Sequence, residues 1–240
     1  MSNLARISIR AAEIGSYRSL PTGLSELNFD GGRTATIFLP STRHDTENLP
    51  LVCMLHGAGG AYANTLASLL EFAGRGKLAV VAPHSQRPTW DVLYGSYGDD
   101  VRFIEFLIAL MVRRNGVDSS RLALAGFSDG ASYALTVGLK NGDVFSDVIA
   151  FSPGFFLPNA VIGKPRIFIS HGSADRILPV TSAREIAQNL SGDGYSVRFD
   201  EFLGGHEVPH DILQAAVGSF LRQEARRPMA LPTDHACQHR

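Results

Sequence analysis

Residues 121–135 read RLALAGFSDGASYAL, and this stretch carries the strongest local signal in the sequence. Its first part is a mostly apolar, strand-like run, and its last part is compatible with a helix. Between them lies GFSDG (residues 126–130), a G-x-S-x-G pentapeptide. A serine at such a strand–turn–helix junction has a strained backbone, and the glycines let neighbouring chains pack closely against it. The stretch predicts a buried strand, 121–126, that leads into a sharp turn at Ser128; an ordinary Ser/Gly turn is the alternative.

Short apolar runs and longer helical patterns alternate on both sides of this stretch. The expected strands are 34–39, 51–55, 78–83, 121–126, 147–151, 166–170 and 196–202. The expected helices lie near 61–74, 99–114, 129–140, 181–190 and 210–224. Several strands are continuous apolar runs, which is typical of parallel strands covered by helices on both faces. We therefore expect an α/β protein with a doubly wound, mostly parallel sheet.

The ends of the chain depart from this alternation. The first 33 residues are expected to form an antiparallel edge of the sheet. The last stretch, 226–240, contains two prolines and has no periodicity, which predicts a flexible tail behind a single domain of residues 1–225. The link 152–165 between two strands is too short for a large cap domain.

Composition and charge narrow the class of protein. The 240 residues have a formal net charge of −1, with 45% hydrophobic and 19% charged residues. These are ordinary globular values, and so small a charge offers no electrostatic footprint for nucleic acid or an anionic membrane. No apolar run has the length of a signal peptide or a membrane span. We expect a cytoplasmic protein that acts on small molecules, binds no nucleic acid and has no stable membrane association.

The cysteines do not indicate a stabilising disulfide, and no residue pattern indicates a bound metal or a cofactor. Cys53 lies in an apolar run and Cys237 in the polar tail, so the two do not make a disulfide framework. No cluster of His, Cys and Asp has metal-ligand spacing, and the glycine-rich loops fit neither phosphate-binding pattern. We expect no metal and no cofactor.

Two downstream loops supply an acid and a base for the serine. HGSAD (171–175) follows one expected strand, and GGH (204–206) follows the last one. Because open α/β sheets gather their sites at the carboxyl ends of the strands, these loops should meet the serine turn. A serine hydroxyl needs a base within hydrogen-bond reach. We predict Ser128 as the nucleophile, His206 as the base and Asp175 as the residue that orients the base.

Each assignment has a structural alternative. Asp175 could be a helix cap or turn residue, and His206 a solvated loop residue. Asp91, Asp129 and Asp193 are rival carboxylates: Asp129 should point away into the turn, and the other two do not follow a strand in the right order. A base must be neutral, so we expect activity to fall as the pH drops through the pKa of imidazole, about 6.5 in model peptides.

An oxyanion site is expected at the loop HGAGG (56–60), which follows an apolar strand and opens a helix. A tetrahedral intermediate needs preorganised hydrogen-bond donors, and glycines let backbone amides face a substrate. We predict that the amides of Ala58 and Asp129 form this site. The amide of Gly57 or of Gly59 remains the alternative to that of Ala58.

The sequence gives weaker signals for the residues of the substrate pocket than for the three predicted catalytic residues. Phe155 and Phe156 lie on a short loop and are candidates for lining an acyl pocket, although they could equally cover the core. Trp90, the only tryptophan, is a candidate pocket wall, with core packing as the alternative. His56 and His171 stand at the starts of their loops, and structural roles are expected for both.

Four segments, taken in order, resemble one family: LHGAGG (55–60), GFSDG (126–130), HGSADRILP (171–179) and GGH (204–206). They are similar to the bacterial phospholipase/carboxylesterase-type and dienelactone-hydrolase-like branch of the α/β-hydrolases, which has feruloyl-esterase-like and polyhydroxybutyrate-depolymerase-like relatives. The resemblance spans roughly residues 50–210. It implies the α/β-hydrolase fold, ester hydrolysis without a cofactor, and the same three catalytic residues.

The chain departs from parts of that branch. Dienelactone hydrolases use a cysteine nucleophile, whereas Ser128 stands here. Polymer-degrading relatives are usually exported, and because no export signal is expected here, attack on polymers is not expected. The resemblance therefore implies a serine esterase for short-to-medium acyl or aryl esters, with a small-molecule ester as its partner. A thioesterase or acyltransferase with the same three residues, and a non-catalytic binding protein of this fold, are the alternatives.

Overall fold

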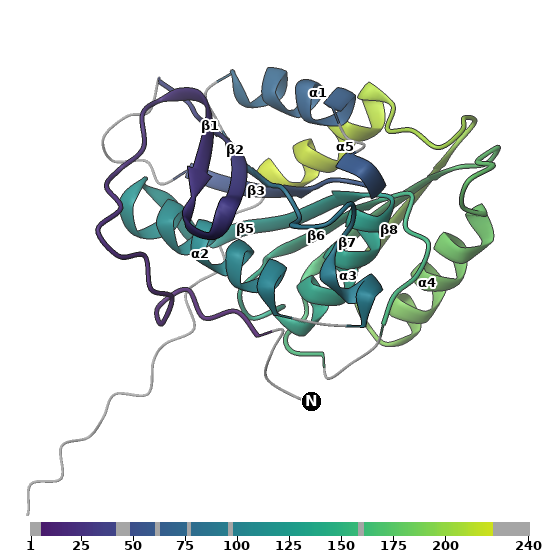
Figure 1. Ribbon diagram of the computed structural model, residues 1–240. Helices are drawn as coiled ribbons and strands as arrows, with labels where there is room; N and C mark the ends of the chain where they lie inside the picture. Colours follow the sequence, from purple (N-terminus) through teal and green to yellow (C-terminus); the bar gives the residue numbers. More distant parts are fainter. Residues whose placement is uncertain are drawn as a thin grey trace, which may run out of the picture.

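The computed structural model is organised around an eight-stranded sheet (Figure 1). The structure describes residues 6–41, 49–60, 63–75, 78–95, 98–157 and 161–222. The strands are β1 (Gly23–Phe29), β2 (Arg33–Leu39), β3 (Leu49–Leu55), β4 (Ala79–Pro83), β5 (Val117–Phe127), β6 (Asp147–Phe151), β7 (Arg166–Gly172) and β8 (Val197–Phe202). The helices are α1 (Ala63–Ala73), α2 (Asp99–Arg114), α3 (Asp129–Lys140), α4 (Val180–Gly192) and α5 (His210–Leu221). Short 3-10 turns are η1 (Asp30–Gly32), η2 (Ala58–Gly60) and η3 (Asp91–Tyr94).

The strand order is β1-β2-β4-β3-β5-β6-β7-β8. In this order, all neighbours from β4 through β3, β5, β6 and β7 to β8 pair in parallel. The pairs β1–β2 and β2–β4 are antiparallel. The predicted doubly wound, mostly parallel α/β sheet is therefore confirmed. The antiparallel edge expected within the first 33 residues is β1, in which Gly23 pairs with Leu39 and Phe29 with Arg33.

Helices cover both faces of the sheet, with α1 and α5 on one face and α2, α3 and α4 on the other (Figure 1). Successive side chains of a strand point to opposite faces. In β3, Leu51, Cys53 and Leu55 accordingly join the core under α2, α3 and α4, while Val52 and Met54 join the core under α1 and α5. This double burial explains why the central strands are continuous apolar runs.

Differences from the expected boundaries are small and have local causes. β5 begins at Val117, four residues before the expected start, because Val117 pairs with Leu49 ahead of an irregularity, after which the register resumes with Leu122 opposite Leu51. Its Asp118 side chain accepts hydrogen bonds from the amide and the hydroxyl of Ser120. The predicted tail, 226–240, lies outside the described residues. No described helix has the length and apolar character needed to cross a bilayer.

The parallel strands bring four loops together at the end of the sheet where their carboxyl termini lie. β3, β5, β7 and β8 all end there, because parallel neighbours share their direction. The loops that follow carry the segment 56–60, Ser128, Asp175 and His206. The link 152–165 has no helix in its described part and is too short for a large cap over this end of the sheet.

Candidate active site

Ser128 occupies a sharp turn between β5 and α3. Its backbone has φ 57° and ψ −120°, a conformation that residues other than glycine rarely adopt. The Ser128 amide donates to the Phe151 carbonyl at 2.9 Å, and the Ser128 carbonyl accepts from the Ala131 amide at 2.9 Å. The surrounding structure therefore over-determines a strained conformation, which is a common feature of functional sites.

The two glycines of the pentapeptide are required by close packing. A Cβ on Gly126 would lie 2.2 Å from the carbonyl oxygen of Gly130. A Cβ on Gly130 would lie 2.4 Å from the Leu55 carbonyl oxygen and 2.5 Å from that of His56. The first turn of α3 thus packs directly against the end of β3, which brings the amide that follows Ser128 beside the loop 56–60.

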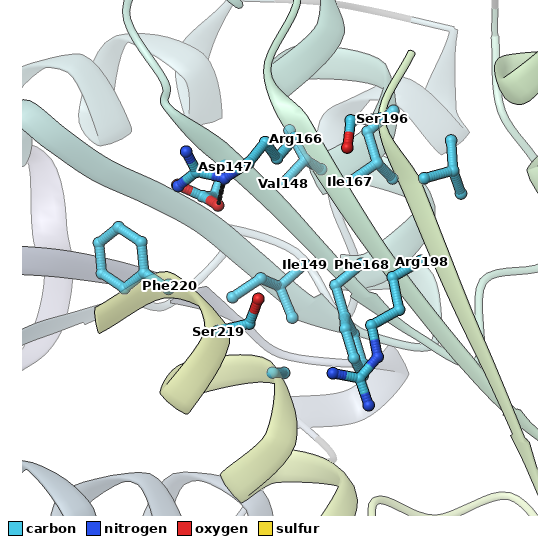
Figure 2. Close-up of a pocket in the computed structure, with 12 residues that line it drawn as sticks. Asp147, Val148, Ile149, Arg166, Ile167, Phe168, Ser196, Arg198, Ser219 and Phe220 are labelled. Carbon is cyan, nitrogen blue, oxygen red and sulfur yellow. Dashed lines mark hydrogen bonds and ion pairs between the residues drawn. The ribbon is translucent and has the colours of Figure 1, made fainter. Parts of the chain in front are cut away.

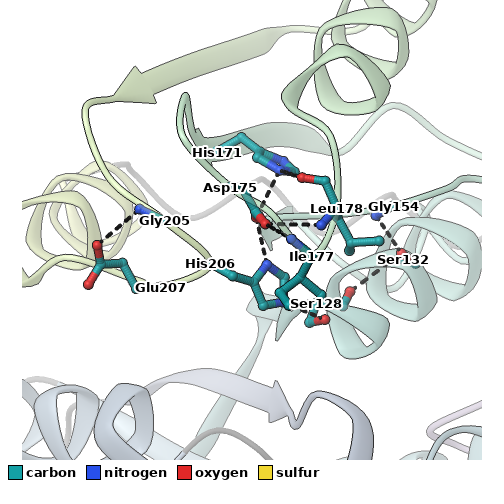
Figure 3. Close-up of polar contacts among 10 residues, drawn as sticks. All are labelled: Ser128, Ser132, Gly154, His171, Asp175, Ile177, Leu178, Gly205, His206 and Glu207. Carbon is teal, nitrogen blue, oxygen red and sulfur yellow. Dashed lines mark hydrogen bonds and ion pairs between the residues drawn. The ribbon is translucent and has the colours of Figure 1, made fainter.

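Ser128, His206 and Asp175 form a continuous chain of hydrogen bonds (Figure 3). The distance from His206 Nε2 to Ser128 Oγ is 2.9 Å, and the distance from His206 Nδ1 to Asp175 Oδ2 is 2.6 Å. A carboxylate only accepts, so Nδ1 carries the proton and Nε2 is left to accept from the serine hydroxyl. The Phe127 ring, 4.8 Å from the imidazole centroid, packs against His206.

Asp175 is held as an ionised carboxylate. Burial by itself would raise the pKa of the Asp175 carboxyl, but hydrogen bonds from the Leu178 amide, the His206 ring and the Ile177 amide lower this pKa below its ordinary value. Both amides donate to Oδ1, at 3.0 Å from Leu178 and 2.8 Å from Ile177. A carboxylate that stays charged at neutral pH can fix the tautomer of His206 and stabilise an imidazolium.

The loops that carry the acid and the base are joined by their backbones. A Cβ on Gly172 would lie 2.2 Å from the carbonyl oxygen of Gly205 and 2.4 Å from that of Gly204. The Ala174 amide donates to the Gly204 carbonyl at 2.9 Å. These contacts fix the distance between the two loops, so the contact between Asp175 and His206 does not depend on long side chains alone.

The two predicted oxyanion donors are the amide of Ala58, in the loop 56–60, and that of Asp129, at the start of α3. No hydrogen bond joins the amide of Ala58 or of Asp129 to another residue in the described part of the chain. The Gly59 amide, by contrast, donates to the Pro88 carbonyl at 2.6 Å. Because of this bond the Gly59 amide is not available as an oxyanion donor, whereas the amide of Gly57 remains an alternative to that of Ala58. The geometry is compatible with the pair Ala58 and Asp129.

The His56 side chain stabilises the loop 56–60 through hydrogen bonds that involve both ring nitrogens. Its Nδ1 donates to the Gly57 carbonyl at 2.7 Å, and its Nε2 accepts from the Ser85 amide at 3.0 Å. Burial lowers the pKa of the His56 imidazole below its ordinary value, so the neutral ring that this pair of bonds requires is favoured. The structural role expected for His56 matches these contacts.

The prediction that Trp90 walls the substrate pocket is wrong. Its side chain is completely buried, so it cannot contact substrate. The indole Nε1 donates to the His56 carbonyl at 2.8 Å, and the ring stacks on Tyr133 with centroids 5.2 Å apart. Core packing was the alternative, and it holds because the indole reaches a long-range partner that no local pattern reveals.

The rival carboxylates of Asp91 and Asp129 are hydrogen-bonded elsewhere, and Asp193 lies at the C-terminal end of α4. Asp91 accepts from the Tyr133 hydroxyl at 2.7 Å, and burial raises the pKa of the Asp91 carboxyl. Asp129 accepts from the Thr89 hydroxyl at 2.9 Å. Among the described contacts, none joins these three carboxylates to His206, which leaves Asp175 as its acidic partner.

Phe155 and Phe156 are half-buried and line a pocket of about 690 Å³ beside α4. Ser128, Asp175 and His206 are not among its lining residues. Phe156 also packs against the larger core. In this structure the two phenylalanines therefore lie together in a pocket, but that pocket is not formed by the three predicted catalytic residues.

A smaller cavity of about 130 Å³ lies between β6, β7, β8 and α5 (Figure 2). Asp147 and Arg166, which line it, begin β6 and β7, so the cavity lies away from the strand ends that carry Ser128. Arg166 is paired with Asp147 at 2.7 Å, and the other lining arginine, Arg198, with Asp200 at 2.5 Å. The described residues include no group of three or more acidic, histidine or cysteine side chains suited to a metal ion.

Sequence reasoning missed the residues that hold Asp175. The amides of Ile177 and Leu178 donate to its carboxylate, and His171 lies against it from β7. The usable signal was the aspartate itself, because an Asp side chain commonly accepts hydrogen bonds from the backbone two or three residues ahead. The approach of His171 leaves no such local signal.

Comparison with known proteins points to ester hydrolysis. A family model described as Phospholipase/Carboxylesterase matches residues 101–224. A probable feruloyl esterase C of Aspergillus clavatus is 26% identical over 90% of this chain and 88% of its own length. A second probable feruloyl esterase C, of Aspergillus niger, is 24% identical over 75% of this chain and 67% of its own. An acyl-protein thioesterase 1 of Gibberella zeae is 29% identical over 46% of this chain and 51% of its own.

Solved structures share the fold at low sequence identity. A thermostable esterase has a TM-score of 0.69 at 20% identity, over 85% of this chain and 63% of that one. An S-formylglutathione hydrolase of Staphylococcus aureus has a TM-score of 0.68 at 15% identity, over 82% and 98%. Esterase PE8 has a TM-score of 0.61 at 23% identity, again over 82% and 98%. These likenesses identify the architecture as that of the α/β-hydrolases.

Proposed function

We propose that Ser128, His206 and Asp175 are the catalytic triad of this chain, which belongs to the phospholipase/carboxylesterase family and is a carboxylic-ester hydrolase of the α/β-hydrolase fold. The proposed substrates are short-to-medium acyl or aryl esters. The proposed mechanism passes through a covalent acyl-enzyme on Ser128.

Acylation begins with the transfer of the Ser128 proton. His206 Nε2 takes that proton while Oγ attacks the ester carbonyl carbon, and Asp175 stabilises the imidazolium that forms. The tetrahedral intermediate places its negative oxygen against the amides of Ala58 and Asp129. When the intermediate collapses, the bond to the alcohol oxygen breaks and His206 returns the proton to the departing alcohol.

Deacylation repeats these steps with water. His206, neutral again, takes a proton from a water molecule whose oxygen attacks the acyl carbon. The second tetrahedral intermediate collapses with cleavage of the bond to Ser128 Oγ, which recovers its proton from His206. The carboxylic acid leaves, and no cofactor is needed because every proton taken up is returned.

One observation carries this proposal: the unbroken hydrogen-bonded chain from Ser128 Oγ through His206 to Asp175. Its members come from three loops, and the serine is held in a strained turn. A purely structural network would not need an accessible base, whereas the His206 side chain is 15% exposed.

A thioesterase activity is the second candidate. It is favoured by the partial match to the acyl-protein thioesterase 1 of Gibberella zeae, which covers 46% of this chain. The same triad would act on a thioester, since only the leaving group differs. Comparing the hydrolysis of short p-nitrophenyl esters with the turnover of acyl-CoA separates the two candidates.

The test of the proposed function is a panel of p-nitrophenyl esters of increasing acyl length, run with the wild-type chain and with Ser128→Ala. We expect the substitution to lower kcat by at least about 10³-fold. Ser191→Ala, at an exposed position of α4, is the matched control and should retain the wild-type rate. Wild-type activity in Ser128→Ala would refute the assignment of the nucleophile.

A further inference from the structure

His171 lies against the proposed triad but takes no part in the mechanism described above. It is the penultimate residue of β7, and its side chain is completely buried. Its Nε2 is 3.0 Å from the Leu178 carbonyl oxygen and 3.1 Å from Asp175 Oδ2 (Figure 3). A second imidazole therefore contacts the same carboxylate oxygen that accepts the hydrogen bond from His206.

These contacts define the protonation of the His171 ring. The Leu178 carbonyl oxygen and the Asp175 carboxylate are both acceptors, so Nε2 must carry a proton. Nδ1 is buried and has no hydrogen-bond partner in the part of the chain that the structure describes. A proton on Nδ1 would be an unsatisfied buried donor, which is costly. The ring is therefore expected to be the neutral tautomer with its proton on Nε2.

His171 holds the acid loop at two points. It donates to the carbonyl of Leu178, whose own amide donates to Asp175 Oδ1. It also places the positive end of an N–H dipole beside Oδ2, the oxygen that faces His206. Because His171 is fully buried in β7, which is paired on both sides with β6 and β8, both contacts tie the carboxylate to the sheet.

From this geometry we propose that His171 is a positioning residue for the triad. It holds the carboxylate of Asp175 in line with His206 and draws part of the negative charge away from Oδ2, which sets the basicity of His206. The proposal rests on the proposed function, since it concerns the same triad. It assigns His171 no contact with substrate.

The other charged groups near His171 are already paired. Its register partner on β8 is Glu201, whose carboxylate forms an ion pair with Arg184 of α4 at 2.6 Å. On its own loop the charged group that faces it is Asp175, and the next titratable group is His206. Removing His171 therefore alters mainly the environment of Asp175.

The direction of the effect follows from charge. Without the Nε2 proton of His171, the negative charge of Asp175 acts on His206 alone, which stabilises the imidazolium and moves the acidic limb of the pH–rate profile to higher pH. The carboxylate is also held less firmly, so kcat should fall roughly tenfold, while KM changes little because substrate is not contacted.

The experiment measures kcat, KM and the pH dependence of kcat/KM with p-nitrophenyl acetate for wild type, His171→Leu and His171→Gln. The glutamine amide nitrogen can occupy the place of Nε2, so His171→Gln should restore both kcat and the acidic limb. Thermal melting of each variant shows how far stability alone has changed. An acidic limb in folded His171→Leu that stays at the wild-type pH overturns the proposal, as does a glutamine variant that fails to restore it.

A measurement on the wild-type chain covers the case in which His171→Leu does not fold. In ¹⁵N-labelled protein, NMR of the His171 ring should report a protonated Nε2 and a bare Nδ1 at neutral pH. A proton on Nδ1 alone would overturn the proposal. Ser128→Ala, run in parallel, separates the two ideas: full activity there refutes the proposed function, whereas an inactive Ser128→Ala beside an unaffected His171→Leu refutes only the role of His171.

Discussion

At the scale of single residues, the chemistry depends on where one proton resides. The Nδ1 of His206 donates to Asp175, and this bond leaves Nε2 as the acceptor for the hydroxyl of Ser128. The opposite tautomer would present an N–H to the serine and could not remove its proton. The carboxylate of Asp175 selects the productive form because it can only accept.

Asp175→Asn tests this selection. The amide has nearly the same shape but can donate to Nδ1, so the wrong tautomer becomes favoured and kcat should fall by about 10⁴-fold. Asp193→Asn, at the end of α4, is the matched control and should leave kcat unchanged. Steady-state kinetics at neutral pH gives both values, and a kcat for Asp175→Asn within tenfold of wild type would contradict the assigned role.

Wild type and Asp175→Asn should also differ in how their stability depends on pH. The pKa of Asp175 is lowered in the folded state, so its charged form adds stability above its unfolded pKa, about 3.9, and this contribution disappears as the pH falls through the lower folded value. The difference in melting temperature between wild type and Asp175→Asn should therefore be greatest near neutrality and shrink below about pH 4. Thermal melts from pH 7 to pH 3 measure it, and a difference that grows on acidification would be inconsistent with the lowered pKa.

At the scale of elements, the site depends on how closely α3 approaches β3. Gly130 allows this contact because its missing side chain would overlap the carbonyl oxygens of Leu55 and His56. The approach places the first turn of α3 against the end of β3, and we expect this packing to bring together the amides of Asp129 and Ala58 in the proposed oxyanion site.

Gly130→Ala should separate these elements. The added methyl group meets backbone atoms that cannot rotate away, so we expect a loss of at least about 2 kcal/mol, or roughly 4–8 °C in melting temperature, together with a lower kcat. Gly192→Ala, near the end of α4 where a Cβ meets nothing within 4 Å, is the control and should melt at or above the wild-type temperature. Equal melting temperatures and rates for the two variants would argue against the close approach.

A second contact between elements joins the Trp90 indole to the carbonyl of His56, at the start of the loop 56–60. Trp90→Phe keeps an aromatic ring over Tyr133 but removes the hydrogen bond to the His56 carbonyl. Leaving that carbonyl without its donor should destabilise the protein by about 1–3 kcal/mol and lower kcat with little change in KM. Chemical denaturation and kinetics on the ester panel check this expectation; a variant with wild-type kcat would mean that the loop holds its shape without Trp90.

The elements themselves were largely predictable from the sequence, and their long-range contacts were not. Apolar runs and turn residues located the strands, and the GFSDG turn located the serine at the end of β5. The polar start of β5 escaped because residues 118–120 show no apolar pattern. Trp90 was misplaced because its burial depends on Tyr133 and His56, which are distant in sequence and lie on other elements.

At the scale of the whole molecule, the sheet gathers residues that are far apart in the chain. Parallel strands turn the order of Ser128, Asp175 and His206 along the sequence into one cluster at one edge, and that cluster was predictable for this reason. The pocket was not, because the place of Phe155 and Phe156 beside α4 depends on how a helix and a loop pack together. Substrate preference belongs to this scale and needs the ester panel.

The most direct test of the proposed covalent mechanism is to trap the acyl-enzyme. The wild-type chain is mixed with a p-nitrophenyl ester, quenched in acid within the first turnovers, digested and mapped by mass spectrometry. We predict an acyl group on the peptide that contains Ser128 and none on that peptide from Ser128→Ala. Burial raises the thiol pKa of Cys53 far above neutrality, so no acylation is expected there. Acylation of Cys53 or of another residue, or turnover without any covalent intermediate, would contradict the assignment of Ser128 as the nucleophile.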